Sequence, residues 1–504
     1  MSNIRVTYSG LISFGVTILS LFTGLAFTLI VTRSLSVDDF GLWSLISSIL
    51  IYVMIFIPIQ SFWITRHIAR KEEAVVTGIG STGLFSMAAM IIYLGIILLV
   101  AGNTDANFEV LLLATLMIPM IYFNNILGSS VVGYKPEGVS YGLLVFEFVK
   151  IPVGLVLVYW NDMGINGAIL TTVLANLCQL SFYLFYIRSK LKEKFYKKLF
   201  KKWLKLSWLP MLYNAHDRIL HLDATIFAFF TGSVTAIAYV GVARTIGNLV
   251  SNTSTISAGL YTKLLSTDKK EFVMFSFRQT MLFSIPMLGF SIIFAKAGLW
   301  ILNPQYIDGI FIVYLWCIIH FTYVFEIILS NALIGIERVD VDFSSKFKDY
   351  VKSKLVIIPV IYAIGYTIYL GMLVGVLVTS SSQTNFTDLG IIFWWGIVGI
   401  ITNIAIVLTF WKMTSDNIQF KFPVKSSVKY TVATLCSSLV AYFLMDNFLI
   451  YEKSIFIFLP NLIPFMLIFL IIYLGIMVYW DKDSKNLIKA IINELKPKKN
   501  NGDK

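Results

Sequence analysis

The sequence predicts an all-α integral membrane protein with about fourteen transmembrane helices. Three observations predict this fold class. Of the 504 residues, 57% are hydrophobic and 13% are charged, and the mean hydropathy is +0.80. The apolar residues form long segments, and about 20 such residues in a helix span the roughly 30 Å hydrocarbon layer of a bilayer. Lys and Arg gather in alternate connections between these segments.

The apolar segments follow one another along the whole chain. We expect them to be helices, because a single apolar segment satisfies its backbone hydrogen bonds in lipid only as a helix. The first runs to Arg33 without a small-residue cleavage site, so we interpret it as a membrane helix and not as a secretory signal. The expected spans are 8–31, 41–63, 77–101, 108–131, 139–160, 165–187, 207–230, 234–261, 273–301, 309–334, 355–379, 390–411, 428–448 and 455–479.

The positive charges predict the topology. Arg5, the connections after the even-numbered spans together with the adjoining Lys429, and the tail from Lys482 contain 33 of the 40 Lys and Arg residues. Cytoplasmic connections retain Lys and Arg, so we expect a multi-pass protein of the cell membrane with both termini in the cytoplasm. Topology thus accounts for the net charge of +12. We expect neither a nucleic-acid partner nor a metal site, because no nucleic-acid-binding motif or metal-ligand spacing is found.

Two pairs of short matches about 200 residues apart indicate an internal duplication. Residues 126–133 (ILGSSVVG) and 328–335 (ILSNALIG) each follow the fourth helix of a half, and residues 36–43 (SVDDFGLW) and 233–240 (SVTAIAYV) each precede the second. A duplicated six-helix unit inserts both copies with the same orientation. We therefore expect two pseudo-symmetric six-helix lobes around a central cavity, with two more helices on the flank.

The expected domains are an N-lobe at 1–187, a basic amphipathic cytoplasmic linker at 188–206, a C-lobe at 207–412, the last two helices at 413–481 and a basic cytoplasmic tail at 482–504. In the linker, apolar residues recur every three or four positions among nine cationic residues and one acid. We expect a helix on the cytoplasmic leaflet whose lysines attract anionic lipid. The alternative interpretation is a solvated connector whose charges only set the topology.

Ionisable side chains within the spans are the candidate site. Each costs roughly 2.5–3.5 kcal/mol at the bilayer centre, so such residues usually face a cavity or a partner. Cations in a cavity suit an anionic cargo, and the planar arginine side chain suits phosphate. Helix 7 carries Asn214, His216, Asp217, Arg218, His221 and Asp223. The candidate substrate-binding residues are Arg244, Arg218, Arg66, Asp217, Lys150, Glu147 and Glu326, and the candidate hinges are Pro58 and Pro210.

Each of these assignments has a structural alternative. Glu147 and Lys150, three residues apart, would form a neutralised pair. Arg66 lies near a span end, from which its side chain would reach the headgroups. Asp217 would neutralise Arg218. The prolines would be ordinary packing kinks.

Two motifs resemble those of a known family. Arg33-x-Leu35-x-x-x-Asp39-Phe40-Gly41-x-Trp43 resembles the opening signature of the polysaccharide and lipid-linked oligosaccharide (O-antigen type) flippases. These are a branch of the superfamily that also holds the multidrug and toxic-compound extrusion (MATE) transporters. Helix 7, with Asp217-Arg218 and Asp223 followed by Gly232-Ser233-Val234 and Tyr239, is similar to the acidic helix 7 of that family.

The resemblance implies a flippase that moves a polyprenyl-phosphate-linked or diphosphate-linked sugar to the outer leaflet by alternating access. Arg244 and Arg218, with Arg66 near the entrance, would hold the phosphate and sugar headgroup. Transport would use H⁺, Na⁺ or the membrane potential and no cofactor. Membrane lipids, together with polymerases or glycosyltransferases of a surface-polysaccharide pathway, would be its partners.

Two other functional classes remain as alternatives. A cation-coupled drug or metabolite exporter of the same superfamily would share the lobes, but has twelve helices as a rule. A membrane glycosyltransferase would use Asp38 and Asp39 on the first outer connection. We expect no enzyme, because the predicted outer connections of about a dozen residues leave little room for a catalytic module and no nucleotide-binding loop is found. We expect both aspartates to lie at the start of helix 2 and stabilise it.

Overall fold

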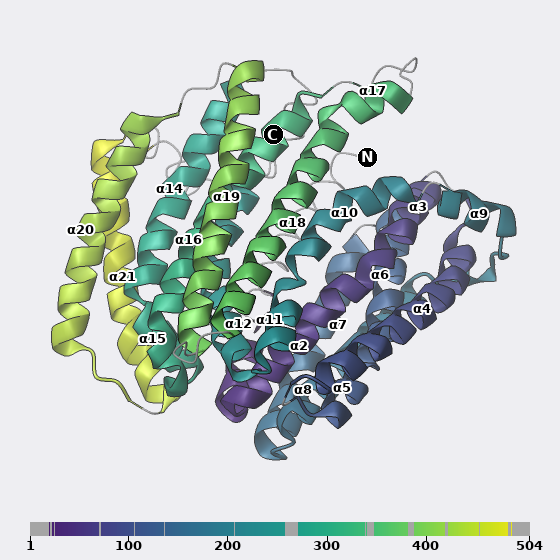
Figure 1. The fold of residues 1–504 in the computed structure, drawn as a ribbon, viewed down its shortest axis with the longest axis horizontal. Coiled ribbons are helices and arrows are strands. Elements are labelled where there is room, and N and C mark those ends of the chain that lie inside the picture. Colours follow the sequence, from purple (N-terminus) through teal and green to yellow (C-terminus); the bar gives the residue numbers. More distant parts are fainter. Residues whose placement is uncertain are drawn as a thin grey trace, which may run out of the picture. The chain divides into compact units, whose positions relative to one another are not determined.

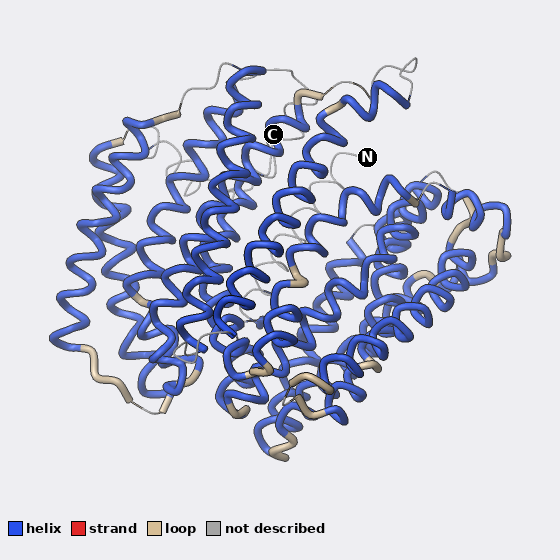
Figure 2. Tube along the Cα trace, in the orientation of Figure 1, coloured by secondary structure: helices blue, strands red, loops and turns tan. Residues whose placement is uncertain are grey.

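A computed structural model describes residues 20, 23–24, 26–69, 72–104, 106–135, 137–205, 207–257, 271–337, 339, 347–381, 388–418, 422–452, 454–481 and 485. This part of the chain is helical and contains no strand (Figure 2). The longer helices are α2 (Val37–Val53), α3 (Ile57–Ala69), α4 (Val75–Ala101), α6 (Met117–Tyr134), α7 (Glu137–Gly154), α8 (Gly164–Tyr186), α10 (Trp208–Leu220), α12 (Thr235–Ser251), α14 (Glu271–Ile293), α16 (Ile310–Gly335), α18 (Lys354–Ser381), α19 (Asp388–Ile418), α20 (Val424–Phe448) and α21 (Ile455–Trp480) (Figure 1).

Shorter helices connect or extend these. They are η1 (Met54–Phe56), α5 (Phe108–Ala114), η2 (Leu155–Trp160), η3 (Arg188–Lys192), α9 (Lys197–Lys205), α11 (Asp223–Thr231), η4 (Asn252–Ser257), α15 (Ala295–Leu302), η5 (Pro304–Gly309) and α17 (Phe347–Lys352).

The prediction of an all-α multi-pass membrane protein is confirmed. Among the described residues, ten helices are long and apolar enough to cross a membrane, or eleven if 273–293 and 295–302, bent by 65°, form one span. Three expected spans are not among these. Span 8–31 lies largely outside the described residues, span 207–230 is broken into α10 and α11, and span 234–261 is divided between α12 and η4. The count of fourteen therefore stays a prediction.

The chain forms two compact units, whose boundaries differ from those of the predicted lobes. The first unit comprises residues 1–241 and 356–398, and the second comprises 242–355 and 399–504. The boundaries fall inside α12, α18 and α19. The first unit therefore contains the first-half helices together with α10, α11, most of α18 and the start of α19. The two six-helix lobes remain a prediction.

The first unit has a core between α3, α4, α6 and α8. Ile64, Ile126 and Tyr183 are buried there with Trp203 of α9. The Tyr183 ring packs on α7 at Gly142, where a Cβ would lie 2.1 Å from the Tyr183 Cε1 atom. Helices α7 and α8 can approach this closely only because Gly142 has no side chain.

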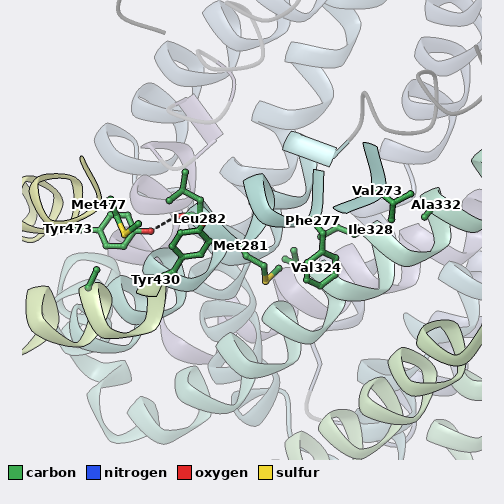
Figure 3. Close-up of a cluster of buried hydrophobic side chains, with 11 residues drawn as sticks. Val273, Phe277, Met281, Leu282, Val324, Ile328, Ala332, Tyr430, Tyr473 and Met477 are labelled. Carbon is green, nitrogen blue, oxygen red and sulfur yellow. Dashed lines mark hydrogen bonds between the residues drawn. The ribbon is translucent and has the colours of Figure 1, made fainter. Parts of the chain in front are cut away.

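The second unit has a core formed by α14, α16, α20 and α21, which Figure 3 shows. Phe277 and Met281 of α14 pack with Val324 of α16, and the Tyr473 hydroxyl donates a 2.6 Å hydrogen bond to the Leu282 carbonyl. At Gly289 of α14, a Cβ would lie 2.3 Å from Thr434 of α20. The last two helices of the chain therefore pack on α14.

Candidate functional site

Pro58 breaks the second expected span. Proline lacks a backbone N–H, and its ring clashes with the carbonyl four residues earlier, here that of Met54. Helix α2 ends at Val53, and η1 separates it from α3. Near this break two side chains donate to α2 carbonyls, the Tyr122 hydroxyl to Val53 at 2.9 Å and the Arg218 Nη1 to Ile51 at 2.6 Å. Arg218 is thus half-buried and bonded to the backbone of a helix from the other half of the chain.

Pro210, the other candidate hinge, lies in the first turn of α10. The first four N–H groups of a helix have no partner within the helix. Proline therefore costs no internal hydrogen bond at this position. The structure places Pro210 just after the end of the linker helix α9 and not in the middle of a span.

The seventh expected span is broken between Leu220 and Asp223. Asp223 is 1% exposed and begins α11, where a carboxylate faces the positive end of the helix dipole. Its Oδ1 accepts a 2.7 Å hydrogen bond from the Ala224 N–H, and its Oδ2 accepts one of 2.9 Å from the Tyr369 hydroxyl. Trp395 Nε1 donates to the Tyr369 oxygen at 2.6 Å. A buried polar chain therefore joins α11, α18 and α19.

The sequence indicates Asp223 as a residue of the site, but it does not indicate Tyr369 or Trp395. One sequence signal was present for the tyrosine. Tyr362, Tyr366 and Tyr369 recur at intervals of four and three, which places three aromatic hydroxyls on one face of α18. All three are buried. No spacing in the sequence indicates that this face meets the start of α11.

The two repeat-related segments at 36–43 and 233–240 contact each other. The Thr235 hydroxyl donates to the Asp38 carboxylate. A Cβ at Gly41 would lie 2.0 Å from the Val234 carbonyl oxygen, and one at Gly241 would lie 2.3 Å from Ser44 Oγ. The starts of α2 and α12 are therefore packed backbone to backbone. We call this arrangement the helix-start contact; the predicted topology places it on the outer side.

Asp38 and Asp39 were expected at the start of the second helix, and they lie at the start of α2. Ser36 is the N-cap, and its hydroxyl accepts a 3.1 Å hydrogen bond from the Asp39 N–H. The Asp39 carboxylate accepts from the same hydroxyl at 2.9 Å. Both aspartates lie in the first turn, where their charges stabilise the helix start.

Glu147 and Lys150 are brought together. The Lys150 Nζ lies 2.6 Å from Glu147 Oε2, and the Ser20 hydroxyl donates to Glu147 Oε1 at 2.7 Å. The ammonium group also lies over the rings of Phe146 and Phe27, at 4.9 and 5.6 Å from their centroids. Both charged residues are buried. This pair is locally neutralised, as the structural alternative describes.

Arg244 and Glu326 belong to the second unit. Arg244 is half-buried on α12, and His320 lies on α16. The two helices are close, because a Cβ at Gly247 would lie 2.5 Å from the His320 ring. Glu326 is fully buried on α16, which contacts α14 and thus the helix that carries Arg278.

Arg66 and Asp217 lie on α3 and α10, but their side chains are outside the described part of the structure. Within the described residues no group of three His, Cys, Asp or Glu could hold a metal ion. The candidate residues are thus distributed over both units.

Comparisons with known proteins address the fold. No protein-family model and no curated protein matches the chain. Among solved structures, the lipid II flippase MurJ in an inward closed conformation matches with a TM-score of 0.68 and 15% identity, covering 95% of this chain and 100% of its own. An inward-facing MATE family multidrug transporter of the MOP superfamily matches with a TM-score of 0.59 and 14% identity, covering 81% of this chain and 98% of its own.

These similar structures are a flippase and transporters, not enzymes. The similarity extends over nearly the whole chain and agrees with its long apolar helices. The chain therefore has the fold of the MATE-like transporters and flippases of the MOP superfamily.

Proposed function

We propose that this protein is a flippase that moves a polyprenyl-phosphate-linked or diphosphate-linked oligosaccharide or polysaccharide repeat unit across the cytoplasmic membrane. The observation that carries the proposal is the extent of the fold match. MurJ covers 95% of this chain, whereas the MATE transporter covers 81% although 98% of that transporter is matched. The MurJ match therefore includes residues of this chain that the MATE transporter match leaves out. This difference favours a lipid-linked cargo over a drug.

The proposed transport is by alternating access, and the helix-start contact lies within the first unit. It joins α2 of the first half to α12 of the second half on the predicted outer side. In the proposed cycle this contact opens when the cargo leaves toward the outer leaflet. Both termini stay in the cytoplasm, and the lipid tail stays in the bilayer while the headgroup passes between the halves.

Cationic residues would receive the headgroup. Arg244 and Arg218, with Arg66 near the entrance, supply charge for phosphate, and guanidinium groups can bind phosphate through two parallel hydrogen bonds. Asp217 and Glu326 would balance these charges. Glu147 and Lys150 would support the cavity wall as a neutral pair and not bind cargo directly.

The energy source in this proposal is a H⁺ or Na⁺ gradient or the membrane potential. Moving one charge across the potential is worth roughly 2.3 kcal/mol per 100 mV, and an inside-negative potential favours anion export. Asp223 is the carboxylate that we propose for ion coupling, because it is buried and its hydrogen bond from Tyr369 joins α11 to α18. Polymerases or glycosyltransferases of the same pathway are the proposed partners.

A leaflet-sidedness assay tests the cargo class. Purified protein is reconstituted in vesicles with a fluorescent lipid-linked sugar, and the label that reaches the opposite leaflet is measured with a membrane-impermeant quencher. We expect Arg244→Ala to slow translocation about tenfold, the loss typical of one charged hydrogen bond. Arg188→Ala is the matched control, because it removes an exposed cation outside the spans. It should leave the translocation rate unchanged.

The same vesicles distinguish the competing classes. Drug efflux without lipid translocation would identify an exporter. Sugar transfer by the purified protein would identify a glycosyltransferase. Either result, or a wild-type rate for Arg244→Ala, would contradict the assignment of cargo or site.

A further inference from the structure

The linker is attached to first-half helices by its one acidic residue. Glu193 Oε2 accepts hydrogen bonds of 2.9 Å from the backbone N–H groups of Ala74 and Val75. These groups lie at the start of α4, where unpaired donors and the helix dipole stabilise a carboxylate. The Glu193 side chain is only 6% exposed. The acid is therefore withdrawn from the outer surface of the linker.

The apolar side of the linker is also occupied by protein. Trp203 of α9 is 1% exposed and packs beside His67 of α3, with ring centroids 5.9 Å apart. Phe200 meets the edge of Phe85 of α4. These contacts cover Trp203, whereas Leu191, Phe195 and Leu204 are 37%, 45% and 41% exposed.

Tyr196 anchors the middle of the linker. Its backbone N–H donates to Thr77 Oγ1 at 2.9 Å, and its hydroxyl donates to the Glu73 carboxylate at 2.5 Å. This hydrogen bond raises the pKa of the Tyr196 phenol above its usual value, because the nearby negative charge disfavours the phenolate. The linker therefore has a fixed orientation on α3 and α4.

The outward surface of the linker is cationic. Lys197, Lys201 and Lys205 recur every four residues and form one stripe along α9, with Lys198 and Lys202 next to it. Within residues 188–205, which the structure describes fully, the one carboxylate is that of the withdrawn Glu193, and the exposed Glu73 beside the linker is bonded to Tyr196. The exposed lysines of the linker are Lys192, Lys194, Lys197, Lys198, Lys201, Lys202 and Lys205.

This surface lies at the level where membrane spans end. The linker follows α8, which ends at Tyr186, and it contacts the beginning of α4 at Val75 (Figure 1). Both helices are membrane spans. Phe195, Tyr196 and Trp208 are 45%, 42% and 42% exposed here. Trp and Tyr gather at the boundary between lipid tails and headgroups.

We propose that the lysine face of α9 binds the phosphate groups of anionic phospholipids in the adjoining leaflet. The attraction is electrostatic, because the lysine side chains are exposed and the Glu193 side chain is only 6% exposed. Anionic headgroups match the charge of the stripe and are present at the level where it lies. The docked linker would hold this face in one orientation on the first unit. The inference does not depend on the cargo proposed above, since it concerns bulk lipid.

A lipid titration of the full-length purified protein in zwitterionic detergent tests this inference. Phosphatidylglycerol and phosphatidylcholine are added separately, and bound lipid is measured by native mass spectrometry. We expect wild type to prefer phosphatidylglycerol, and Lys197→Gln/Lys201→Gln/Lys205→Gln to bind it about tenfold more weakly. The preference should also fall at 0.5 M NaCl, where the Debye length is only about 4 Å.

The matched control carries the same charge change outside the linker. Lys348→Gln/Lys352→Gln/Lys412→Gln alters three exposed lysines outside the linker and should keep the wild-type affinity. All these lysines are exposed, so both variants should keep the wild-type unfolding temperature. The inference is overturned if the linker variant binds phosphatidylglycerol as wild type does, or if the control loses as much. Displacement of the lipid by millimolar inorganic diphosphate would also overturn it, by showing a site for small anions.

Discussion

Lys150 and Arg218 are both cations on helices of the first unit, but they have different partners. Lys150 meets a carboxylate three residues away on its own helix, at 2.6 Å. Arg218 donates to the Ile51 carbonyl, 167 positions away in the sequence, beside a helix break caused by Pro58. The first interaction is local, because both residues lie on α7. The second joins α10 to α2, two helices of the first unit that are far apart in the sequence.

The largest expected effect is on the local pair. Glu147→Gln would leave the buried Lys150 ammonium without its counter-charge, and breaking a buried pair in this way costs about 3–5 kcal/mol. We expect a large fall in the free energy of unfolding, measured by denaturation in detergent. The double variant Glu147→Leu/Lys150→Met should recover most of the loss, because it removes both charges. Equal instability of the single and double variants would contradict the neutral-pair interpretation.

A smaller effect is expected at Arg218. Arg218→Ala removes a charged hydrogen bond and leaves the Ile51 carbonyl without this donor, at a cost of about 1.5–3 kcal/mol. In a Pro58→Ala background, α2 and α3 can become continuous. There Arg218→Ala should lower the free energy of unfolding by about 1 kcal/mol less than in the wild type. A double-mutant cycle on unfolding free energies measures this coupling. Strictly additive effects would show that Arg218 does not depend on the break.

The smallest effect is expected at Tyr369, where neutral donors and a carboxylate form a chain. Tyr369→Phe removes the hydroxyl that donates to Asp223 and accepts from Trp395, at a cost of about 1–2 kcal/mol. In the proposed mechanism it should also shift the ion dependence of translocation. Phe227→Leu, which alters only the ring stacked on Trp395, is the control and should leave the ion dependence unchanged. An unchanged ion dependence in Tyr369→Phe would remove Asp223 from the coupling proposal.

Local features of the site could be predicted from the sequence. The spacing of Glu147 and Lys150 indicates a pair, because residues three apart on a helix are neighbours. Ser36 and the aspartates after it mark a helix start. The bond between Asp223 and Tyr369 could not be predicted, since the two residues lie 146 positions apart and no periodicity connects α18 to α11. The contact between the segments at 36–43 and 233–240 could not be predicted either. The sequence indicates only that the two segments are similar.

The sequence by itself determined the fold class, because a long apolar helix is the one local structure that satisfies its own backbone in lipid. It also determined where charge gathers, including the lysine stripe of the linker. Only the tertiary structure decided which charges are neutralised and which surfaces stay exposed. Glu193 caps α4, Arg218 bonds to α2 and Gly41 admits the Val234 carbonyl because distant helices approach there. Such approaches depend on the packing of whole helices, which no short segment of sequence encodes.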